Sequence, residues 1–432
     1  MNHRVSALAI LLLSLALCAL SVACTPRTVP ENTPAERAAA RYAADLTFDA
    51  DTRCLEGAVR IEYAAPYADC EEVWLWAPRA EVTAVCEGQS LAAAKQSVYV
   101  RLSLPRAFAY GETIPLDLHI HAACQSQGYT TYATDFLPLA VAWRQGYRMP
   151  APLAHTSYAQ LDEGSVDLCL HMPKAWVAAC VGHTSEATYT DTERVAHYVS
   201  EATQSTALYT SPYWMRRTAE VGDVTWEYYA TSMSDLVWQH VRACAEEANA
   251  LWGRCPVDTV RLVQTAIDYQ GGGLATVTEN HRAVEDAVLS QWCRQPIRDD
   301  CPWIGVSLRA YLGYMYRETY LPQEAETEYR RAKDAVLSYG TMHGETGECA
   351  RLDAALSAYD AEGYATLLRD KGLCMWRTLA DIDDGVRRVA VDLARRSQPL
   401  TWDEVANALR HACGTEYAYF LSAWLGGEVI MV

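Results

Sequence analysis

The stretch that decides the fold of this 432-residue chain is Asp286-Ala287-Val288-Leu289-Ser290-Gln291-Trp292. From residue 282 to the end, apolar side chains recur at helical spacing, so this stretch is predicted to lie on a helix. An apolar strand at 257–265 and the run Gly271-Gly272-Gly273-Leu274-Ala275 precede it, and Trp303-Ile304-Gly305-Val306 follows it. The expected order is therefore a strand, a tight glycine-rich strand exit and two helices.

The first half of the chain reads as strands. Apolar and polar residues alternate at 46–48 and 59–63, and Glu56 and Gly57 are predicted as the turn between these runs. The same alternation returns in further runs at 73–76, 98–100, 114–120, 166–170, 214–219 and 224–229. Helical spacing begins at residue 236. This order predicts an α+β protein, with a β-rich sandwich or saddle followed by a mainly helical domain.

Several segments occur in an order known from one family. They are a hairpin at 42–64, a strand from Pro173-Lys174 to Gly182, and the turn Leu251-Trp252-Gly253-Arg254-Cys255-Pro256 before the strand Val260-Arg261-Leu262-Val263. With Gln291-Trp292 and Trp303, this order resembles the membrane alanyl aminopeptidase family, the gluzincin zinc metallopeptidases of peptidase family M1. The resemblance covers most of the mature chain. It implies a β-rich N-terminal domain followed by a thermolysin-like, mainly helical, catalytic-type domain.

The zinc motif of that family is degenerate in this chain. In His-Glu-x-x-His, two imidazoles one helical turn apart hold zinc and the glutamate deprotonates the bound water, while a glutamate on the next helix is the third ligand. The resemblance places Asp286 and Ser290 at the histidine positions, Ala287 at the base position and Val306 at the third-ligand position. Alanine cannot accept a proton and valine cannot bind a metal. No His-Glu-x-x-His occurs anywhere in the chain.

The substrate-handling positions are also altered. The resemblance places Ala275 where the family has the glutamate that binds the free amine of a peptide. Arg369 is the nearest counterpart of the tyrosine that stabilises the oxyanion, because it stands just before Lys371-Gly372, and Tyr364 lies a little over one helical turn away. The resemblance therefore implies a site in which none of these positions holds the expected residue.

Two further pairs of residues can each be interpreted either as metal ligands or as solvent-exposed polar groups. His281 and Glu285 can share a helix face and bind a metal with Glu279, or they can be a solvated first turn. His119 and His121 point to the same side of a strand, which permits a metal but equally describes an exposed polar face. The chain lacks Gly-x-Ser-x-Gly, and Gly271-Gly272-Gly273 lacks the Lys-Ser/Thr of a phosphate loop. We expect no cofactor, and zinc only if the chain is a divergent metallopeptidase.

The first 24 residues predict a lipoprotein signal peptide. His3 and Arg4 are followed by an apolar core at 7–20 and by Ser21-Val22-Ala23-Cys24, where small residues precede a cysteine. The apolar run is short for an uncleaved membrane anchor. Acylation of Cys24 would tether the chain to a membrane, and the proline-containing residues 25–38 suit a spacer. We expect an extracytoplasmic protein, lipid-anchored to the bacterial membrane, with domains at 39–207 and 208–432.

Composition excludes some partners. Half of the residues are apolar and 21% are charged, as in ordinary globular domains. The formal net charge of −18 argues against nucleic acid or anionic lipid, since both require basic patches. The 26 tyrosines suit either a ligand groove or a core. Tyr311, Tyr314 and Tyr316 can line the former cleft, or pack in the core with their apolar neighbours.

The cysteines favour buried thiols over bridges. Beyond Cys18 and Cys24, thirteen of the fifteen cysteines remain, and several stand where valine or alanine would suit. Cys293 and Cys301 are the candidate bridge by proximity. No Cys-x-x-Cys pair supports a structural zinc site made of cysteines.

These observations predict a membrane-anchored, aminopeptidase-like protein without peptidase activity, which binds an extended peptide or a partner protein in a retained cleft. One alternative is a divergent zinc aminopeptidase with a non-standard metal site. Another is a structural component docked on a membrane transporter.

Overall fold

The computed structural model describes residues 40–141, 164–184, 187–203, 205–267, 269–295, 297, 301–343, 351–354, 358–414 and 417–427. The predicted signal peptide, Cys24 and the spacer lie outside the described residues. Within the described ranges, no helix combines the length and the apolar character needed to cross a membrane.

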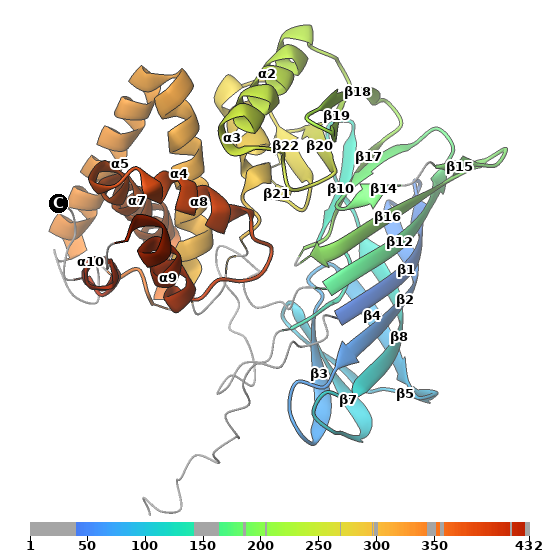
Figure 1. Cartoon of the computed structure of the whole chain (residues 1–432). Helices are drawn as coiled ribbons and strands as arrows, with labels where there is room; N and C mark the ends of the chain where they lie inside the picture. The colour runs from blue at the N-terminus through green and yellow to red at the C-terminus, as the bar shows by residue number, and fades with distance from the viewer. Residues whose placement is uncertain are drawn as a thin grey trace, which may run out of the picture. The chain divides into compact units, whose positions relative to one another are not determined.

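The β-rich domain is built on a nine-stranded sheet in the order β14-β16-β12-β1-β2-β8-β4-β5, with β15 beside β16 (Figure 1). Its strands are β1 (Ala40–Asp49), β2 (Cys54–Ala64), β4 (Ala80–Cys86), β5 (Gln89–Ser90), β8 (Thr113–Ala123), β12 (Gly164–Pro173), β14 (His183–Thr184), β15 (Thr188–Tyr189) and β16 (Glu193–Thr203). β1 pairs antiparallel with β2 and parallel with β12. Burial alternates residue by residue along β1, so one face of the sheet is buried and the other faces solvent.

Two four-stranded sheets complete this domain. One has the order β13-β17-β10-β9, and the other β11-β3-β7-β6. Their strands are β3 (Cys70–Trp76), β6 (Ala93–Gln96), β7 (Tyr99–Phe108), β9 (Gln125–Gln127), β10 (Thr130–Thr134), β11 (Leu139–Ala140), β13 (Val177–Cys180) and β17 (Ala207–Ser211). Side chains from all three sheets share one hydrophobic core that includes Leu46, Phe108 and Leu208.

The turn between the first two strands differs from the prediction. Gly57 lies inside β2 opposite Leu46, and the turn falls between β1 and β2 at residues 50–53. A Cβ atom added at Gly57 would lie 2.1 Å from the carbonyl oxygen of Asp45. This glycine is therefore required by a close approach of two strands and not by a chain reversal.

The helical domain begins with a five-stranded sheet in the order β18-β19-β20-β22-β21. Its strands are β18 (Met215–Val221), β19 (Val224–Ala230), β20 (Thr259–Gln264), β21 (Gln270–Gly271) and β22 (Leu274–Val277). The helices are α2 (Asp235–Trp252), α3 (His281–Leu289), the 3₁₀ turn η2 (Ser290–Trp292), α4 (Pro302–Tyr320), α5 (Pro322–His343), α6 (Ala361–Gly363), the π-helix η5 (Tyr364–Lys371), α7 (Gly372–Ile382), α8 (Gly385–Arg395), α9 (Trp402–Cys413) and α10 (Ala418–Leu425). The predicted α+β class, strands first and helices after, is confirmed (Figure 1).

The change from one domain to the next falls between β17, which ends at Ser211, and β18, which starts at Met215. A buried arginine links the two parts. Arg261 of β20 pairs with Glu227 at 3.0 Å and donates to the backbone carbonyls of Cys180, at 3.2 Å, and Gly182.

Several buried side chains resolve alternatives left by the sequence. Tyr311, Tyr314 and Tyr316 are each at most 3% exposed, and Tyr311 stacks on Trp376, so these tyrosines belong to the core. Cys293 is a buried free thiol that lies 3.9 Å from the carbonyl oxygen of Gly305. The candidate bridge between Cys293 and Cys301 is therefore not formed, and the buried thiol that the sequence favours is found at Cys293.

Candidate functional site

The helix that should carry the zinc ligands is present as α3. β22 runs directly into it, and the Asn280 side chain caps it by accepting from the backbone N–H of Arg282 at 2.8 Å. At its other end Trp292 is fully buried, stacks near Trp226 and donates to the carbonyl of Gly253 at 2.9 Å. The pair Gln291-Trp292 is thus explained by the packing of the tryptophan, and it does not depend on metal ligands at the preceding positions of α3.

Asp286, at the first ligand position, is held by two arginines. Arg317 Nη1 lies 3.1 Å from Asp286 Oδ1, and Arg282 Nε lies 3.4 Å from Asp286 Oδ2. Both guanidinium groups also contact Glu328 of α5, Arg317 through Nε at 2.6 Å and Arg282 through Nη2 at 2.8 Å. Two acids and two bases therefore form a closed network on α3, α4 and α5.

The Arg317 side chain runs back along α4 and passes Gly313, one helical turn earlier. A Cβ atom added at Gly313 would be 2.8 Å from Arg317 Nη2, so the glycine leaves room for the guanidinium. The Arg317 side chain is only 3% exposed. A fixed positive charge therefore neutralises Asp286, where a metalloenzyme of this fold would use a metal ion.

The next two positions of the motif contain no free metal-binding group. Ala287 is 0% exposed and packs in the core. The Ser290 hydroxyl donates to the carbonyl of Ala287 at 2.8 Å, and Gln291 Nε2 donates to the same carbonyl at 3.1 Å. Ser290 therefore uses its polar group to end its own helix.

The remaining positions are also apolar or engaged. Val306 is buried in α4, and Ala275 is fully buried in β22 between its partners Leu262 and Gln270. Arg369, in η5, pairs with Asp370 at 2.8 Å, and the same carboxylate accepts from Arg331 of α5 at 3.3 Å.

Segment η5 and the helix that follows it, α7, both pack against α4. A Cβ atom at Gly372 would lie 2.4 Å from the Cβ of Ser307, the residue after Val306. The indole of Trp376 donates to the Ser307 hydroxyl at 2.9 Å. π-helical segments are common at functional sites, and this one carries Arg369.

A catalytic zinc does not fit these residues. Asp286 offers a carboxylate that two arginines already neutralise, Ser290 donates its proton to a carbonyl, and Val306 offers no donor atom. Ala287 supplies no base. We derive no hydrolytic step from this site.

A third residue, His240, which the sequence did not indicate, lies close to the candidate metal ligands His281 and Glu285. His240 of α2 lies with Nε2 3.5 Å from Glu285 Oε1, and its ring is 4.6 Å from that of His281. The buried Glu285 carboxylate raises the pKa of His240 above its ordinary value, against the opposing effect of burial. Glu279 is directed elsewhere, to Gln264 Nε2 at 3.0 Å. The metal prediction at His281 and Glu285 stays a prediction.

His119 and His121 lie on the exposed face of β8, as expected from their spacing. His119 Nε2 is 3.5 Å from Glu56 Oε1 of the neighbouring strand β2. A second group on the same face of the sheet was missed by the sequence reading. It consists of Asp45, Cys169 and His171, and its only sequence signal is the Cys-x-His alternation within a strand.

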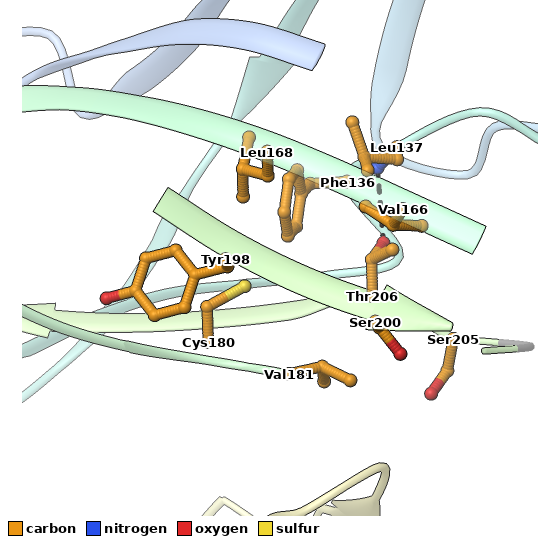
Figure 2. A pocket seen from close by; sticks show the side chains of 10 residues that line it. All are labelled: Phe136, Leu137, Val166, Leu168, Cys180, Val181, Tyr198, Ser200, Ser205 and Thr206. Carbon is orange, nitrogen blue, oxygen red and sulfur yellow. Dashed lines mark hydrogen bonds between the residues drawn. The ribbon is translucent and has the colours of Figure 1, made fainter. Parts of the chain in front are cut away.

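A small cavity lies inside the β-rich domain (Figure 2). Its volume is about 10 Å³, room for about one water molecule, and Leu168, Cys180 and Tyr198 are among its lining residues. The Thr206 hydroxyl accepts from the backbone N–H of Leu137 at 3.3 Å beside it. A peptide cannot enter a cavity of this size.

No protein-family model and no curated protein matches this chain. Its fold is similar to solved structures of M1 zinc metallopeptidases. A Glu-to-Ala variant from Deinococcus radiodurans, bound to a Tyr-Ser-Ala substrate, has 15% sequence identity and a TM-score of 0.66, and the match covers 90% of this chain and 94% of that one. A second structure, of the M1 zinc metallopeptidase from the same organism, has 15% identity, a TM-score of 0.63 and coverage of 90% and 93%.

A third structure is a two-domain M1 zinc metallopeptidase variant bound to L-arginine, with 16% identity, a TM-score of 0.65 and coverage of 90% and 94%. At this level of identity the likeness shows the fold alone. The chain therefore has a peptidase M1-like fold.

Proposed function

We propose that this protein is a lipid-anchored, extracytoplasmic member of the M1-like fold that binds an extended peptide or a partner protein without hydrolysing it. The observation that carries the proposal is the ion network around Asp286. There the guanidinium of Arg317 supplies a positive charge where hydrolysis would need a Lewis acid.

Catalysis by this fold also needs a base, and the geometry supports its loss. The position after Asp286 is a buried alanine inside a packed core, so a water molecule has neither a metal to polarise it nor a carboxylate to deprotonate it. The rest of the scaffold, including the helix pair α3 and α4 and the segment η5, is retained. A fold that is retained while its catalytic residues are absent favours a role in binding.

Two observations support a class of ligand. One is the molecules bound in solved structures of similar fold, and the other is the partly exposed guanidinium of Arg369. One structure of similar fold holds a tripeptide and another a free amino acid. Arg369 is about half exposed, and the buried Asp370 that pairs with it is shared with Arg331. We propose that Arg369 contacts a carboxylate or a backbone carbonyl of the bound peptide.

The test measures binding and turnover on the same sample. The full chain, purified in mild detergent, is titrated with Tyr-Ser-Ala and other tripeptides by calorimetry, and the mixtures are then analysed by mass spectrometry for cleavage after incubation with zinc. We expect binding with intact peptide. Turnover that 1,10-phenanthroline abolishes would instead establish the divergent metallopeptidase.

Arg369→Ala is the informative variant, and Arg330→Ala is its control, because Arg330 is also an exposed helical arginine paired with one carboxylate. We expect the first to weaken peptide binding at least tenfold and the second to leave it unchanged. Equal affinities would remove Arg369 from the site. Capture of one integral membrane protein, with no peptide binding, would favour the transporter-docked alternative.

The anchor has its own test. In cells fed a clickable palmitate analogue, the native chain should be labelled and found in the membrane fraction, whereas Cys24→Ala should carry no label. A labelled Cys24→Ala chain would contradict lipidation at that residue.

A further inference from the structure

Three chemically different ligand groups converge on the solvent-exposed face of the nine-stranded sheet. Asp45 of β1 stands opposite Cys169 of β12 in their parallel register, and His171 is the next residue on that face of β12. One donor atom from each of the three lies within 4.8 Å of the other two. Among the residues that the structure describes, no other group of three such side chains meets this condition.

The distances suit a tetrahedral metal site. With metal bonds of about 2.0–2.3 Å, neighbouring ligand atoms in a zinc tetrahedron are about 3.3–3.6 Å apart. Cys169 Sγ lies 3.4 Å from His171 Nε2, and His171 Nε2 lies 3.1 Å from Asp45 Oδ1. Two sides of this triangle are therefore within a few tenths of an ångström of the spacing in a zinc tetrahedron, and the third is at most 4.8 Å.

The second nitrogen of His171 is also positioned as in a metal site. Its Nδ1 lies 3.2 Å from Glu193 Oε1 of β16. A metal-bound histidine almost always donates its other N–H to a carboxylate or carbonyl, which fixes the tautomer and leaves the first nitrogen free to bind. Glu193 therefore orients His171 so that Nε2 faces Cys169 and Asp45.

Another His–carboxylate contact on the same face lacks these features. His119 faces Glu56 at 3.5 Å, and the residues of β1 and β4 that flank this pair in register place no thiol beside it. At Asp45, Cys169 and His171, the types of ligand atom determine which metal ions the group would bind. One thiolate, one imidazole and one carboxylate suit zinc and its borderline neighbours and not magnesium or calcium, which prefer oxygen alone.

We propose that Asp45, Cys169 and His171 bind one zinc-class divalent cation, with Glu193 as the positioning residue. The fourth position of the tetrahedron is open to a water molecule from solvent. The cation ties β1 and β12 together across a long separation in sequence. This site is distinct from the degenerate one on α3 and α4.

Binding of the cation releases a proton. A thiol must lose its proton before its sulfur binds a metal ion as a thiolate, and this holds for Cys169. The metal–sulfur bond forms as this proton leaves to the buffer, and no electron is transferred. Zinc affinity should therefore rise with pH.

The test uses the full chain, purified with a phosphine reductant and stripped with EDTA. Titration with zinc against a chromophoric chelator should give one site per chain, and cobalt should produce the near-ultraviolet absorption of a thiolate-to-cobalt bond. We expect Cys169→Ser to abolish that absorption, His171→Ala to weaken zinc binding at least tenfold, and Glu193→Gln to weaken it about 10–100-fold.

Two control variants locate the site. His119→Ala removes a comparable exposed histidine, and Asp286→Asn alters the peptidase-like position, so both should retain full affinity and the cobalt spectrum. A missing thiolate band in the native chain, or unchanged affinity in Cys169→Ser, would overturn the proposal. Loss of affinity in Asp286→Asn alone would place the metal on α3.

A thermal measurement separates loss of a ligand from loss of the fold. Zinc should raise the melting temperature of the native chain and of His119→Ala, but not that of Cys169→Ser, whose metal-free melting temperature should match the stripped native chain. These readouts are independent of peptide binding, so failure of either proposal leaves the other standing.

Discussion

Arg317 is the most buried member of the ion network around Asp286, and its removal should be costly. Arg317→Met leaves Arg282 as the cation that pairs with both Asp286 and the partly buried Glu328. Breaking one side of a buried ion network costs about 3–5 kcal/mol. We expect a loss of this size in the free energy of unfolding, measured with urea. Arg330→Ala, which removes an exposed i,i+4 pair, should change it by at most about 0.5 kcal/mol; equal effects would refute the role of burial.

His240 should make stability depend on pH. Its pKa is raised in the folded protein by Glu285, so its stabilising contribution is complete below the unfolded pKa of about 6.5 and is lost as pH rises through the folded pKa. We expect the difference in unfolding free energy between the native chain and His240→Gln to shrink as pH is raised above about 6.5. Unfolding titrations at several pH values would measure it. His411→Gln is the exposed control, and a difference that grows with pH would contradict the assignment.

At the scale of elements, Gly57 decides how closely β1 and β2 can pair. Gly57→Ala places a methyl group against the Asp45 carbonyl, so the strands must separate, and we expect a loss of about 2–4 kcal/mol in unfolding free energy. Gly88→Ala is the matched control. It also has a positive φ, but no atom lies within 4 Å of the added Cβ, so it should cost about 1 kcal/mol from backbone strain alone.

Hydrogen exchange would locate the effect of Gly57→Ala. Amide protection should fall in β1 and β2 and stay unchanged in the helices from α4 onward. Uniform loss of protection across the chain would show that the substitution unfolds the whole molecule instead.

At the scale of the whole molecule, Arg261 connects the two parts of the fold. Arg261→Met leaves the buried Glu227 with the more distant Arg216, at 3.7 Å, as its cation, and we expect a loss of about 3 kcal/mol in unfolding free energy. The double variant Arg261→Met/Glu227→Gln removes this weakly compensated charge and should recover part of that loss. Identical stabilities of the single and double variants, measured by urea unfolding, would show that the lost bonds to the carbonyls of Cys180 and Gly182 dominate instead.

The sequence by itself determined the order of elements and the absence of His-Glu-x-x-His. Strands were predictable because alternation at period two survives in β1, where each second side chain is buried, and helices because their apolar positions repeat each turn. Gly57 was misread as a turn because a glycine in a tight strand crossing and a glycine in a turn look the same locally.

Tertiary structure alone decided which side chains surround Asp286 and where Asp45, Cys169 and His171 meet. Arg317 reaches Asp286 across two helices, and Asp45 meets Cys169 only because β1 and β12 pair in parallel despite the long chain between them. No periodic pattern records such meetings, since they depend on which elements the core brings together. Local periodicity therefore specified the elements of this protein, and long-range packing specified its chemistry.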